Sequence, residues 1–456
     1  MTHGSRVRVG ALSRVEGEGG LELVTENGMV TEARLDIYEP PRFFEALLRG
    51  RQYTEPPDIT ARICGICPVA YQMSACAAIE DACQVTVPEP IAALRRLLYC
   101  GEWIESHALH IYLLHAPDFL GFASGIEMAR SYPGVVRRGL RIKKAGNELM
   151  TAVGGRSVHP VNVRVGGFYR APSSGSLRAL VPELTWARSA AIETVRWVSG
   201  FDFPVFERKY TFAALRHPSV YPITDGSLVT STGLCLEPRD YDEHFTEFQV
   251  PHSTALHSVL DSGVTYLTGP MARFALNRDR LPGWMTGLAC LDGPGPARLD
   301  GPARLDGSAR PDGPARPDGV CRNPFASIVV RAVELLYACD EALRLISAYL
   351  PPDPPYVPVP APADQACGYG WSEAPRGLLY HRYLINPDGS VADAKITPPT
   401  SQNQRAIESD LRDFASSRLL LSEHELGHEC ERLVRSFDPC ISCATHFLDL
   451  RVRPHD

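Results

Sequence analysis

The chain reads RICGICPVAY at residues 62–71 and DPCISCATH at residues 438–446, and these two stretches decide how it folds. Together they contain two Cys-x-x-Cys pairs, made by Cys64, Cys67, Cys440 and Cys443. Thiolates at this spacing are ligands for soft metal ions. Because 372 residues separate the two pairs, a metal site shared by both would join the two ends of the chain at the centre of the fold.

A structural zinc ion is the simplest explanation of four cysteines. Zinc ribbons and knuckles, however, usually place their second pair within a few tens of residues of the first. Residue type alone leaves nickel, iron and copper open as well. Arg62 precedes the first pair and Asp438 precedes the second, and a buried structural zinc site needs neither charge there. The sequence therefore favours a metal centre with chemistry of its own.

The motifs RxCGxC and DPCxxC, the second followed by His446, are the paired signature of nickel-iron hydrogenase large subunits, and the chain resembles that family. The resemblance also includes SRVEGEG at 13–19, GGRSVHPVNVRVGG at 154–167, EAPRG at 373–377 and PPTSQN at 398–403. It covers essentially the whole chain apart from residues 293–319. Within the family, the chain looks most like the soluble, multi-subunit hydrogenases linked to NAD or NADP.

The resemblance implies a nickel-iron centre whose iron also carries carbon monoxide and cyanide. In this family's pattern, Cys64 and Cys440 would be terminal nickel ligands, while Cys67 and Cys443 would bridge nickel to iron. Thiolates suit this work because their electron donation supports a nickel ion that changes oxidation state. Zinc could not take part in such a redox step.

A second ion, magnesium or iron, is also implied near the C-terminus, with Glu45 and His446 as its ligands. Oxygen ligands suit a hard cation of this kind. In this family the precursor is usually cut just after that histidine once nickel is inserted. Residues 447–456 would therefore be a removable tail.

The resemblance assigns further residues to the surroundings of the metals. Glu16 would relay protons from Cys440, because partial burial can raise a carboxyl pKa toward neutrality. Arg376 would overhang the metals as a candidate base, and Asp118 and Asp438 would fix its orientation through charge-assisted hydrogen bonds. The residues expected to contact the cofactor are Arg62, Pro375, Pro399 and Thr400.

One part of this arrangement also follows from the local sequence. The segment PRGLLYHRYLINPDGSVADAKITPPTSQN predicts a hairpin with its turn at residues 386–389. If the numbers of paired residues sum to about 776, Arg376 lies opposite Thr400 at the open end of the hairpin. A cation and a hydroxyl group would then stand where a negatively charged iron-cyanide unit needs hydrogen-bond donors.

Residues 424–428 offer a competing interpretation, because they spell HELGH, the HExxH pattern of zinc proteases. The segment predicts a helix opened by a capping box of Ser422 and Glu425. The apolar stripe of that helix is formed by Leu426, Cys430, Leu433 and Phe437. Both histidines lie on the opposite face, and Val434 stands where metzincins have their third histidine. The sequence therefore argues against a protease.

Composition sets wider limits. The chain has 456 residues, 44% of them hydrophobic and 22% charged, so it is globular and can bury a large core. A net charge of -7 argues against nucleic acid as a partner. No apolar run reaches the roughly 20 residues that span a bilayer, and MTHGSRVRVG lacks an apolar signal core, so we expect a cytoplasmic protein without a membrane span. Thirteen cysteines, an odd number, suggest metal or redox chemistry rather than a disulfide scaffold.

The polarity pattern predicts a mainly α fold with peripheral β structure (α+β). Residues 20–38 alternate in polarity around Asn27-Gly28, which predicts an N-terminal antiparallel hairpin to accompany the late one. Helical periodicity follows Cys67, and the middle of the chain is expected to be largely helical. Further helices are expected at 186–198, 324–350, 403–415 and 422–436. We expect one domain over residues 1–446, of the hydrogenase large-subunit type, with the PARLDG-like repeat at 293–319 as a flexible insertion.

The implied function is that of a catalytic subunit interconverting hydrogen with two protons and two electrons. The sequence has no third cysteine cluster for an iron-sulfur chain, so an iron-sulfur small subunit is implied, and a flavin-containing diaphorase subunit would complete transfer to NAD(P). A maturation endopeptidase and nickel-insertion chaperones would be further partners. The alternative is a non-catalytic or differently coupled hydrogenase-like subunit of a respiratory or proton-pumping complex. Such relatives typically lose the metal cysteines, and all four remain here.

Overall fold

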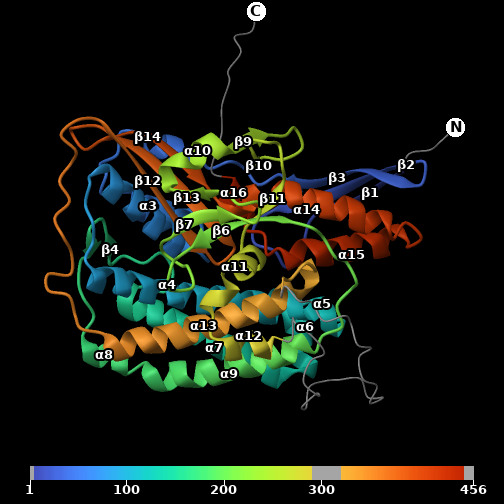
Figure 1. Cartoon of the computed structure of the whole chain (residues 1–456). Helices are drawn as coiled ribbons and strands as arrows, with labels where there is room; N and C mark the ends of the chain where they lie inside the picture. Colours follow the sequence, from blue (N-terminus) through green and yellow to red (C-terminus); the bar gives the residue numbers. More distant parts are fainter. Residues whose placement is uncertain (1–4, 290–319, 446–456) are drawn as a thin grey trace, which may run out of the picture.

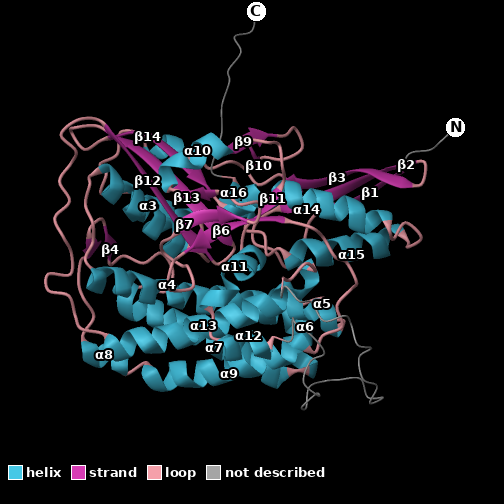
Figure 2. Cartoon of the chain, in the orientation of Figure 1, coloured by secondary structure: helices cyan, strands magenta, loops and turns pink. Residues whose placement is uncertain are grey.

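The computed structural model describes residues 5–289 and 320–445. Three sequence-based predictions lie outside these residues: the insertion at 293–319, His446 as a metal ligand, and the removable tail at 447–456. The described part forms two layers, a layer of long helices and a layer that combines small sheets with further helices (Figures 1 and 2).

Four long helices make the helical layer: α4 (Glu89–Leu109), α7 (Pro133–Gly154), α9 (Val181–Ser199) and α13 (Ser327–Ala348). The first turns of α4, α7 and α9 contain proline, whose missing N–H costs no hydrogen bond there. Helix α13 is buried on every side from Ser327 to Cys339, in keeping with its apolar sequence. Close approach of α4 to α7 requires glycine, because a Cβ at Gly146 would lie 2.6 Å from the carbonyl oxygen of Gly101.

The predicted N-terminal hairpin is confirmed. Strands β2 (Gly19–Glu26) and β3 (Met29–Ile37) pair antiparallel, and β1 (Ser5–Val9) adds a third strand beside β2. Asn27 and Gly28 have φ values of 53° and 74°, the left-handed conformation that a two-residue hairpin turn of type I′ requires.

The predicted late hairpin is confirmed as β13 (Gly377–Ile385) and β14 (Val391–Thr397), with Tyr380 opposite Thr397, one residue from the predicted register. Thr400 does not lie on a strand opposite Arg376, because β14 ends first and Thr400 is in the first turn of α14 (Pro399–Ser416). A strand that was not predicted, β12 (Ala366–Ala374), pairs with β13 across a two-residue turn made by Pro375 and Arg376.

Strand β12 lies against α3 (Pro68–Ala82), the helix that follows the first cysteine pair. A Cβ at Gly368 would lie 2.0 Å from the carbonyl oxygen of Ala78, and one at Gly370 would lie 2.4 Å from the Ala78 nitrogen. These two glycines therefore let the sheet and α3 pack backbone against backbone. This contact fixes the turn after β12 relative to the first cysteine pair.

The expectation that the middle of the chain is largely helical is wrong between residues 211 and 267, where six short strands lie. They are β6 (Thr211–Arg216), β7 (Ser227–Thr230), β8 (Cys235–Leu236), β9 (Phe245–Gln249), β10 (Leu256–Leu260) and β11 (Tyr266–Leu267). Of these, β6 and β11 pair in parallel, whereas β9 and β10 form an antiparallel hairpin. The whole is still a mixed fold with mostly helices and small sheets, as predicted.

The remaining helices are short apart from α15. They are α1 (Phe44–Leu48), α2 (Pro56–Thr60), α5 (Ala116–Leu120), α6 (Gly125–Ser131), α8 (Ser174–Arg178), α10 (Tyr241–His244), α11 (Pro270–Asn277), α12 (Gly283–Leu288), α15 (Glu423–Ser436) and α16 (Ile441–Ala444). A small hairpin is formed by β4 (Val163–Arg164) and β5 (Gly167–Phe168). Helices α9, α13, α14 and α15 confirm four of the predicted helices.

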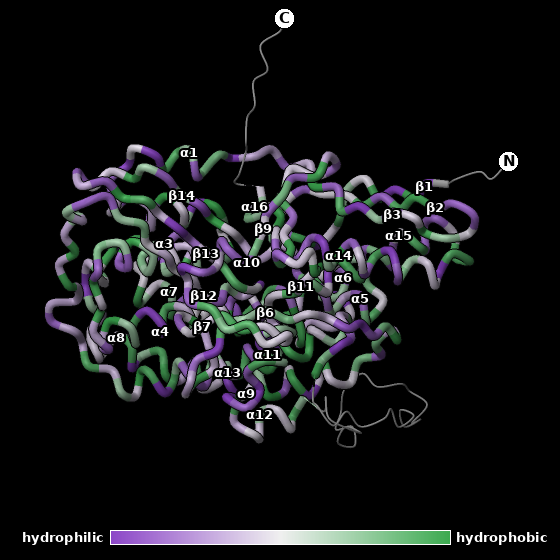
Figure 3. Tube along the Cα trace, turned by 45° about the horizontal axis from the view of Figure 1, so that its top comes forward, coloured by the Kyte–Doolittle hydropathy of each residue, from purple (hydrophilic) through white to green (hydrophobic). Residues whose placement is uncertain are grey.

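Hydrophilic and hydrophobic residues alternate along the helices (Figure 3). Within residues 5–289 and 320–445, no helix combines the length and the apolar character needed to cross a membrane.

Candidate metal centre

The four cysteines of the two motifs form one buried cluster. Cys64 and Cys67 lie just before α3. Cys440 immediately precedes α16, and Cys443 lies within that helix. The Sγ atoms of Cys64 and Cys440 are 3.4 Å apart, and those of Cys67 and Cys443 are 3.5 Å apart. All four sulfur atoms lie within 4.8 Å of one another. Two segments from opposite ends of the chain thus provide one ligand set.

The surroundings of the cluster fit a bound metal group. Burial raises the pKa of Cys440 and of Cys443 above that of an ordinary thiol, so thiolates at these two positions need a cation beside them. The buried guanidinium of Arg376 feels the charge of these sulfur atoms, and its Nη1 has no hydrogen-bond partner within the described part of the chain. Metal ions among the sulfur atoms and an anionic ligand facing Arg376 would satisfy both groups.

Arg376 forms a buried ion pair with Asp438. Its Nε donates to the Asp438 carbonyl oxygen at 2.9 Å, and its Nη2 donates to Asp438 Oδ1 at 3.1 Å. Burial lowers the pKa of Arg376, but Asp438 and the neighbouring sulfur atoms outweigh this and raise it well above its usual value. Burial likewise raises the pKa of Asp438, yet Arg376 and His110 outweigh it, so the pKa is lowered. The guanidinium is therefore a fixed cation beside the cluster.

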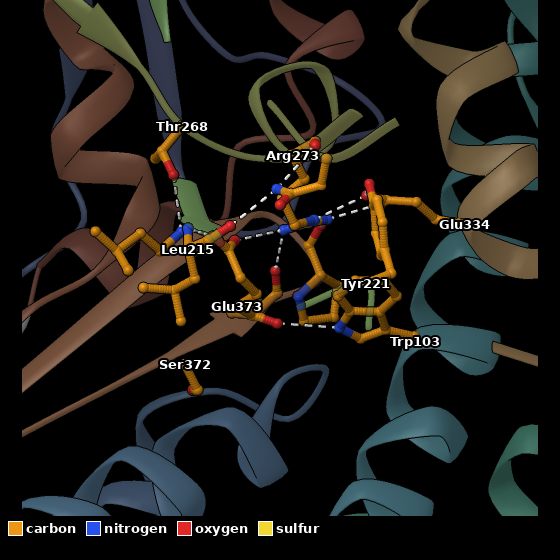
Figure 4. Close-up of polar contacts among 12 residues, drawn as sticks. Trp103, Leu215, Tyr221, Thr268, Arg273, Glu334, Ser372 and Glu373 are labelled. Atoms are coloured by element: carbon orange, nitrogen blue, oxygen red, sulfur yellow. Dashed lines mark hydrogen bonds and ion pairs between the residues drawn. The ribbon is translucent and has the colours of Figure 1, made fainter. Parts of the chain in front are cut away.

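A second buried arginine, Arg273 of α11 (Figure 4), holds the turn that carries Arg376. Its Nη1 donates to the carbonyl oxygen of Ala374 at 2.8 Å, and its Nη2 donates to that of Pro375 at 2.9 Å. Arg273 is fully buried and lies over the ring of Trp103, 4.5 Å from the ring centre. Both backbone carbonyls that precede Arg376 are thus fixed by one side chain.

Two buried carboxylates balance the charge of Arg273. Glu334 of α13 accepts from Nε and Nη2 at 2.8 and 2.7 Å, and Glu373 of β12 accepts from Nη1 at 3.0 Å (Figure 4). Although burial raises the pKa of Glu334, the charge of Arg273 lowers it to about 2. None of these three residues was expected at the site: Arg273 and Glu334 lie in no motif, and Glu373 has no role assigned to it although it begins the EAPRG motif.

Glu16 contacts the second cysteine pair, as the sequence resemblance implied. The Cys440 thiol donates to Glu16 Oε2 at 3.1 Å, and the backbone N–H of Ser442 donates to the same oxygen at 3.1 Å. The backbone N–H of Ile441 also donates to the Glu16 carbonyl oxygen at 3.0 Å. Burial raises the pKa of the Glu16 carboxyl group. A proton-accepting oxygen therefore lies in direct contact with one sulfur atom of the cluster.

Thr400 and Pro399 lie beside the same cysteine pair. The backbone N–H of Cys440 donates to Thr400 Oγ1 at 2.9 Å, which leaves the hydroxyl proton of Thr400 available to a further acceptor. A Cβ at Gly377 would lie 2.9 Å from the Cβ of Pro399, so the arginine turn and the start of α14 meet closely. Pro375, Pro399 and Thr400 are all buried.

Asp118 does not contact Arg376. Its Oδ1 and Oδ2 instead accept from Arg435 at 2.9 and 2.8 Å, and Oδ1 also accepts from Arg14 at 2.5 Å. Two arginines thus occupy the carboxylate that was expected to orient Arg376. Of the two carboxylates expected to orient Arg376, Asp438 alone accepts a hydrogen bond from it.

Arg62 also lies elsewhere than expected. It belongs to a single turn of 3-10 helix, Ala61–Ile63, whose two other residues are buried, so its side chain points outward and is exposed. Its contact with the cofactor stays a prediction, which this outward position does not support. Its exposure shows instead that the cluster lies close to the surface on this side, because Gly65 is exposed as well.

Glu45, the expected ligand of a hard cation, lies in α1. Its Oε1 accepts from the backbone N–H of Ile396 at 2.7 Å. The backbone N–H of Arg42 donates to the carbonyl oxygen of Thr445 at 2.9 Å, so the last described residue lies beside the start of α1. His446, the second expected ligand, is outside the described residues.

Arg42 is a further residue at the site that no sequence motif identifies. Its Nη2 donates to the carbonyl oxygen of Ile63 at 2.7 Å and also to that of Ser442. One side chain thus connects the backbone of the two cysteine segments. The only local signal is an arginine next to prolines, which does not distinguish Arg42 from surface arginines.

The HELGH segment does not form a metal site. His424 and His428 are exposed on α15, and Glu425 forms the predicted capping box, in which it accepts from Ser422 N at 3.0 Å. In the described residues, neither histidine belongs to a group of side chains that could hold a metal ion. This geometry gives no support for a protease site at the motif.

Comparisons with known proteins agree with this arrangement. A family model described as nickel-dependent hydrogenase matches residues 42–131 and 353–446. The chain is 34% identical to the alpha chain of sulfhydrogenase 2 from Pyrococcus furiosus, over 97% of this chain and 100% of the relative. It is also 25% identical to a chain of the F420-non-reducing hydrogenase of Methanothermobacter thermautotrophicus, over 97% of this chain and 95% of the relative.

Solved structures show the same similarity in three dimensions. An NAD+-reducing [NiFe]-hydrogenase in the H2-reduced state matches with a TM-score of 0.80 and 27% identity, over 97% of this chain and 99% of that one. The Ni-Fe-Se hydrogenase of Desulfovibrio vulgaris Hildenborough matches with a TM-score of 0.73 at 21% identity, a likeness of fold alone. Both similarities extend over nearly the whole chain.

Proposed function

Because the chain belongs to the nickel-dependent hydrogenase family, we propose that it is the catalytic large subunit of a hydrogenase that reversibly converts hydrogen into protons and electrons. The observation that supports this most is the buried cluster of four cysteines, faced by a buried arginine and contacted by a carboxyl group. A non-catalytic subunit of a respiratory complex would not need to retain this complete set.

The proposed ligand roles follow the family pattern. In that pattern Cys64 and Cys440 would be terminal nickel ligands, and Cys67 and Cys443 would be shared by nickel and an iron that carries carbon monoxide and cyanide. When bound, this centre supplies the redox-active site at which the bond of hydrogen is split heterolytically. The free Nη1 of Arg376 and the hydroxyl proton of Thr400 are the proposed donors to anionic ligands of the iron.

The proposed proton route starts at the Cys440 sulfur. Glu16 Oε2 lies 3.1 Å from that sulfur, within reach for direct proton transfer. The N–H and S–H groups that point at this oxygen hold the carboxyl group in place. Arg376 stays protonated beside Asp438, so its proposed contribution is a fixed positive charge and hydrogen bonds next to the reacting hydrogen.

The electrons must leave through a partner. In residues 5–289 and 320–445, the only metal-binding group made of cysteines is the one already described. We therefore propose an iron-sulfur small subunit, docked where Gly65 and Arg62 are exposed beside the buried cysteines and where Val158 is 47% exposed. The similarity to an NAD+-reducing hydrogenase supports NAD(P) as the final acceptor, reached through a flavin-containing diaphorase subunit in the cytoplasm.

The C-terminal part of the proposal concerns maturation. Glu45 and His446 are proposed ligands of a magnesium or iron ion, and residues 447–456 are proposed to be removed by a maturation endopeptidase after chaperones insert nickel. Support comes from the position of Thr445, whose carbonyl oxygen accepts from Arg42 next to Glu45.

Metal analysis of protein matured with its own accessory enzymes tests the proposal. Nickel and iron should both be present, and the infrared spectrum should contain bands of metal-bound carbon monoxide and cyanide. Protein that contains zinc in place of nickel, or that lacks these bands, would contradict the proposal. Hydrogen-dependent reduction of NAD and of NADP by the whole complex then identifies the carrier.

A further inference from the structure

A second group of possible metal ligands lies away from the cysteines, where the β9–β10 hairpin meets α14. His252 lies in the loop of that hairpin, His257 lies on β10, and Glu408 lies on α14. His252 Nε2 is 2.7 Å from Glu408 Oε1, and His257 Nδ1 is 3.7 Å from Glu408 Oε2. One donor atom from each residue falls within 4.8 Å of the other two.

The hydrogen bonds of this group are incomplete. The His257 side chain is fully buried, and neither of its ring nitrogens has a hydrogen-bond partner within the described part of the chain. Burial lowers the pKa of His257 to about 3, so the ring is neutral, the form that binds metal ions. Burial raises the pKa of Glu408, while the hydrogen bonds from the Leu35 N–H and from His252 act against this rise.

We propose that His252, His257 and Glu408 bind a divalent transition metal ion, with zinc as the best fit, and that this ion fastens the β9–β10 hairpin to α14. Two imidazoles and a carboxylate are a common ligand set for zinc. With zinc bonds of about 2.0–2.1 Å, two ligand atoms of a tetrahedral site lie about 3.3 Å apart. This value falls between the 2.7 Å and 3.7 Å that separate the nitrogens of His252 and His257 from the nearest Glu408 oxygens. His252 is 20% exposed, so water can reach the fourth position.

A hydrogen bond between His252 and Glu408 alone does not account for the group. It uses Glu408 Oε1, which also accepts from the backbone N–H of Leu35 at 3.0 Å, but it leaves both nitrogens of the buried His257 without a partner in the described part of the chain. A metal ion would satisfy His257 and the charge of Glu408 together. The three residues come from two segments 150 residues apart and form no sequence motif that would identify them.

Zinc binding to the whole complex tests the proposal without using hydrogenase activity, so its outcome is independent of the proposed function. Complex treated with a chelator is dialysed against zinc, and zinc and nickel are then counted per chain. The variants are His257→Gln and His252→Gln. The control is His424→Gln, which removes an exposed histidine of α15.

We expect the wild type and the His424→Gln variant to take up one zinc ion per chain that the chelator had removed. The two ligand variants should bind it more than about tenfold more weakly, a loss that even outer-shell partners of a metal can cause. Nickel content should stay the same in all four proteins. His252 is partly exposed, so its variant reports on binding even if His257→Gln disturbs the core. Equal zinc uptake by all four proteins, or none by the wild type, overturns the proposal.

Discussion

At the scale of single residues, Glu16 is the group whose proposed role can be separated most cleanly from structure. The Glu16→Gln variant keeps an oxygen that can accept from Cys440 and Ser442 but cannot take up a proton at neutral pH. We expect hydrogen oxidation to fall by about 10² or more, with nickel content unchanged, because general acid-base groups contribute about 10²–10⁴-fold. Exchange of deuterium gas with water protons should fall in parallel.

The matched control is Glu18→Gln, two residues away on the exposed side of the same segment. Its activity should equal that of the wild type. Full activity in Glu16→Gln would show that protons leave the cluster by another route.

The histidines of the HELGH motif give a second prediction at this scale. Because His424 and His428 are exposed, the double replacement by glutamine should change the free energy of unfolding by less than about 0.5 kcal/mol. Hydrogen oxidation and nickel content should match the wild type. Loss of a bound metal ion in this variant, measured by elemental analysis, would contradict our interpretation of the motif.

How far single residues could be predicted depends on whether their partners are local. The cysteines, Glu16 and Thr400 were identified through motifs and lie together. Asp118 was misplaced because nothing in the sequence shows that Arg14 and Arg435 compete for its carboxylate. Such competition between buried charges is decided by the tertiary fold.

At the scale of elements, the two-residue turn between β12 and β13 positions Arg376 beside the cysteines. The turn was not predicted, because strand β12 was not predicted. Strand β12 contains Gly368 and Gly370, which weaken its local preference for a strand. The glycines are present because α3 passes so close that side chains would not fit. A tertiary contact, not a local propensity, determines this strand and therefore the position of Arg376.

The turn gives a prediction about Arg273. The Arg273→Lys variant keeps the positive charge but loses the planar fork that holds Ala374, Pro375 and Glu334 together. We expect hydrogen oxidation to fall by about tenfold to a hundredfold, since a misplacement of about 1 Å near a reacting group can cost about 10². The infrared bands of cyanide should shift, and backbone hydrogen exchange of residues 374–379 should become faster.

The control for Arg273 is Arg95→Lys, which changes another buried arginine that forms a two-point ion pair with Glu80 away from the turn. It should cost comparable stability without moving the infrared bands. If both variants lose activity in proportion to stability, Arg273 is a structural residue without a specific effect on Arg376.

At the scale of the whole molecule, the mainly helical architecture was predictable because long amphipathic or apolar segments such as α9 and α13 carry a strong periodic signal. The strands between residues 211 and 267 were not, because each has only two to six residues and no alternation long enough to recognise. The meeting of both chain ends at one cysteine cluster was predicted from the two cysteine motifs and their large separation, because local periodicity gives no sign of it.

The repeat at residues 293–319 gives the prediction that belongs to the whole chain. The segments on either side of it are anchored to one short region: Ser199 Oγ donates to the carbonyl oxygen of Ala289 at 3.4 Å, and Asn323 Nδ2 donates to that of Pro204 at 2.7 Å. A short connection can therefore replace the repeat. We expect deletion of residues 293–319 to leave hydrogen oxidation within about twofold of the wild type, because a longer surface loop adds only a small closure cost.

Activity, nickel content and thermal unfolding of the deletion variant decide this point together. A folded, nickel-containing variant with normal activity supports a single catalytic domain that tolerates the insertion. A folded variant that retains nickel but loses activity would instead show that the repeat contributes to turnover or to contact with a partner protein. Comparing the isolated large and small subunits with the whole complex would then locate that contact, since a defect in partner docking appears only when electrons must leave the chain.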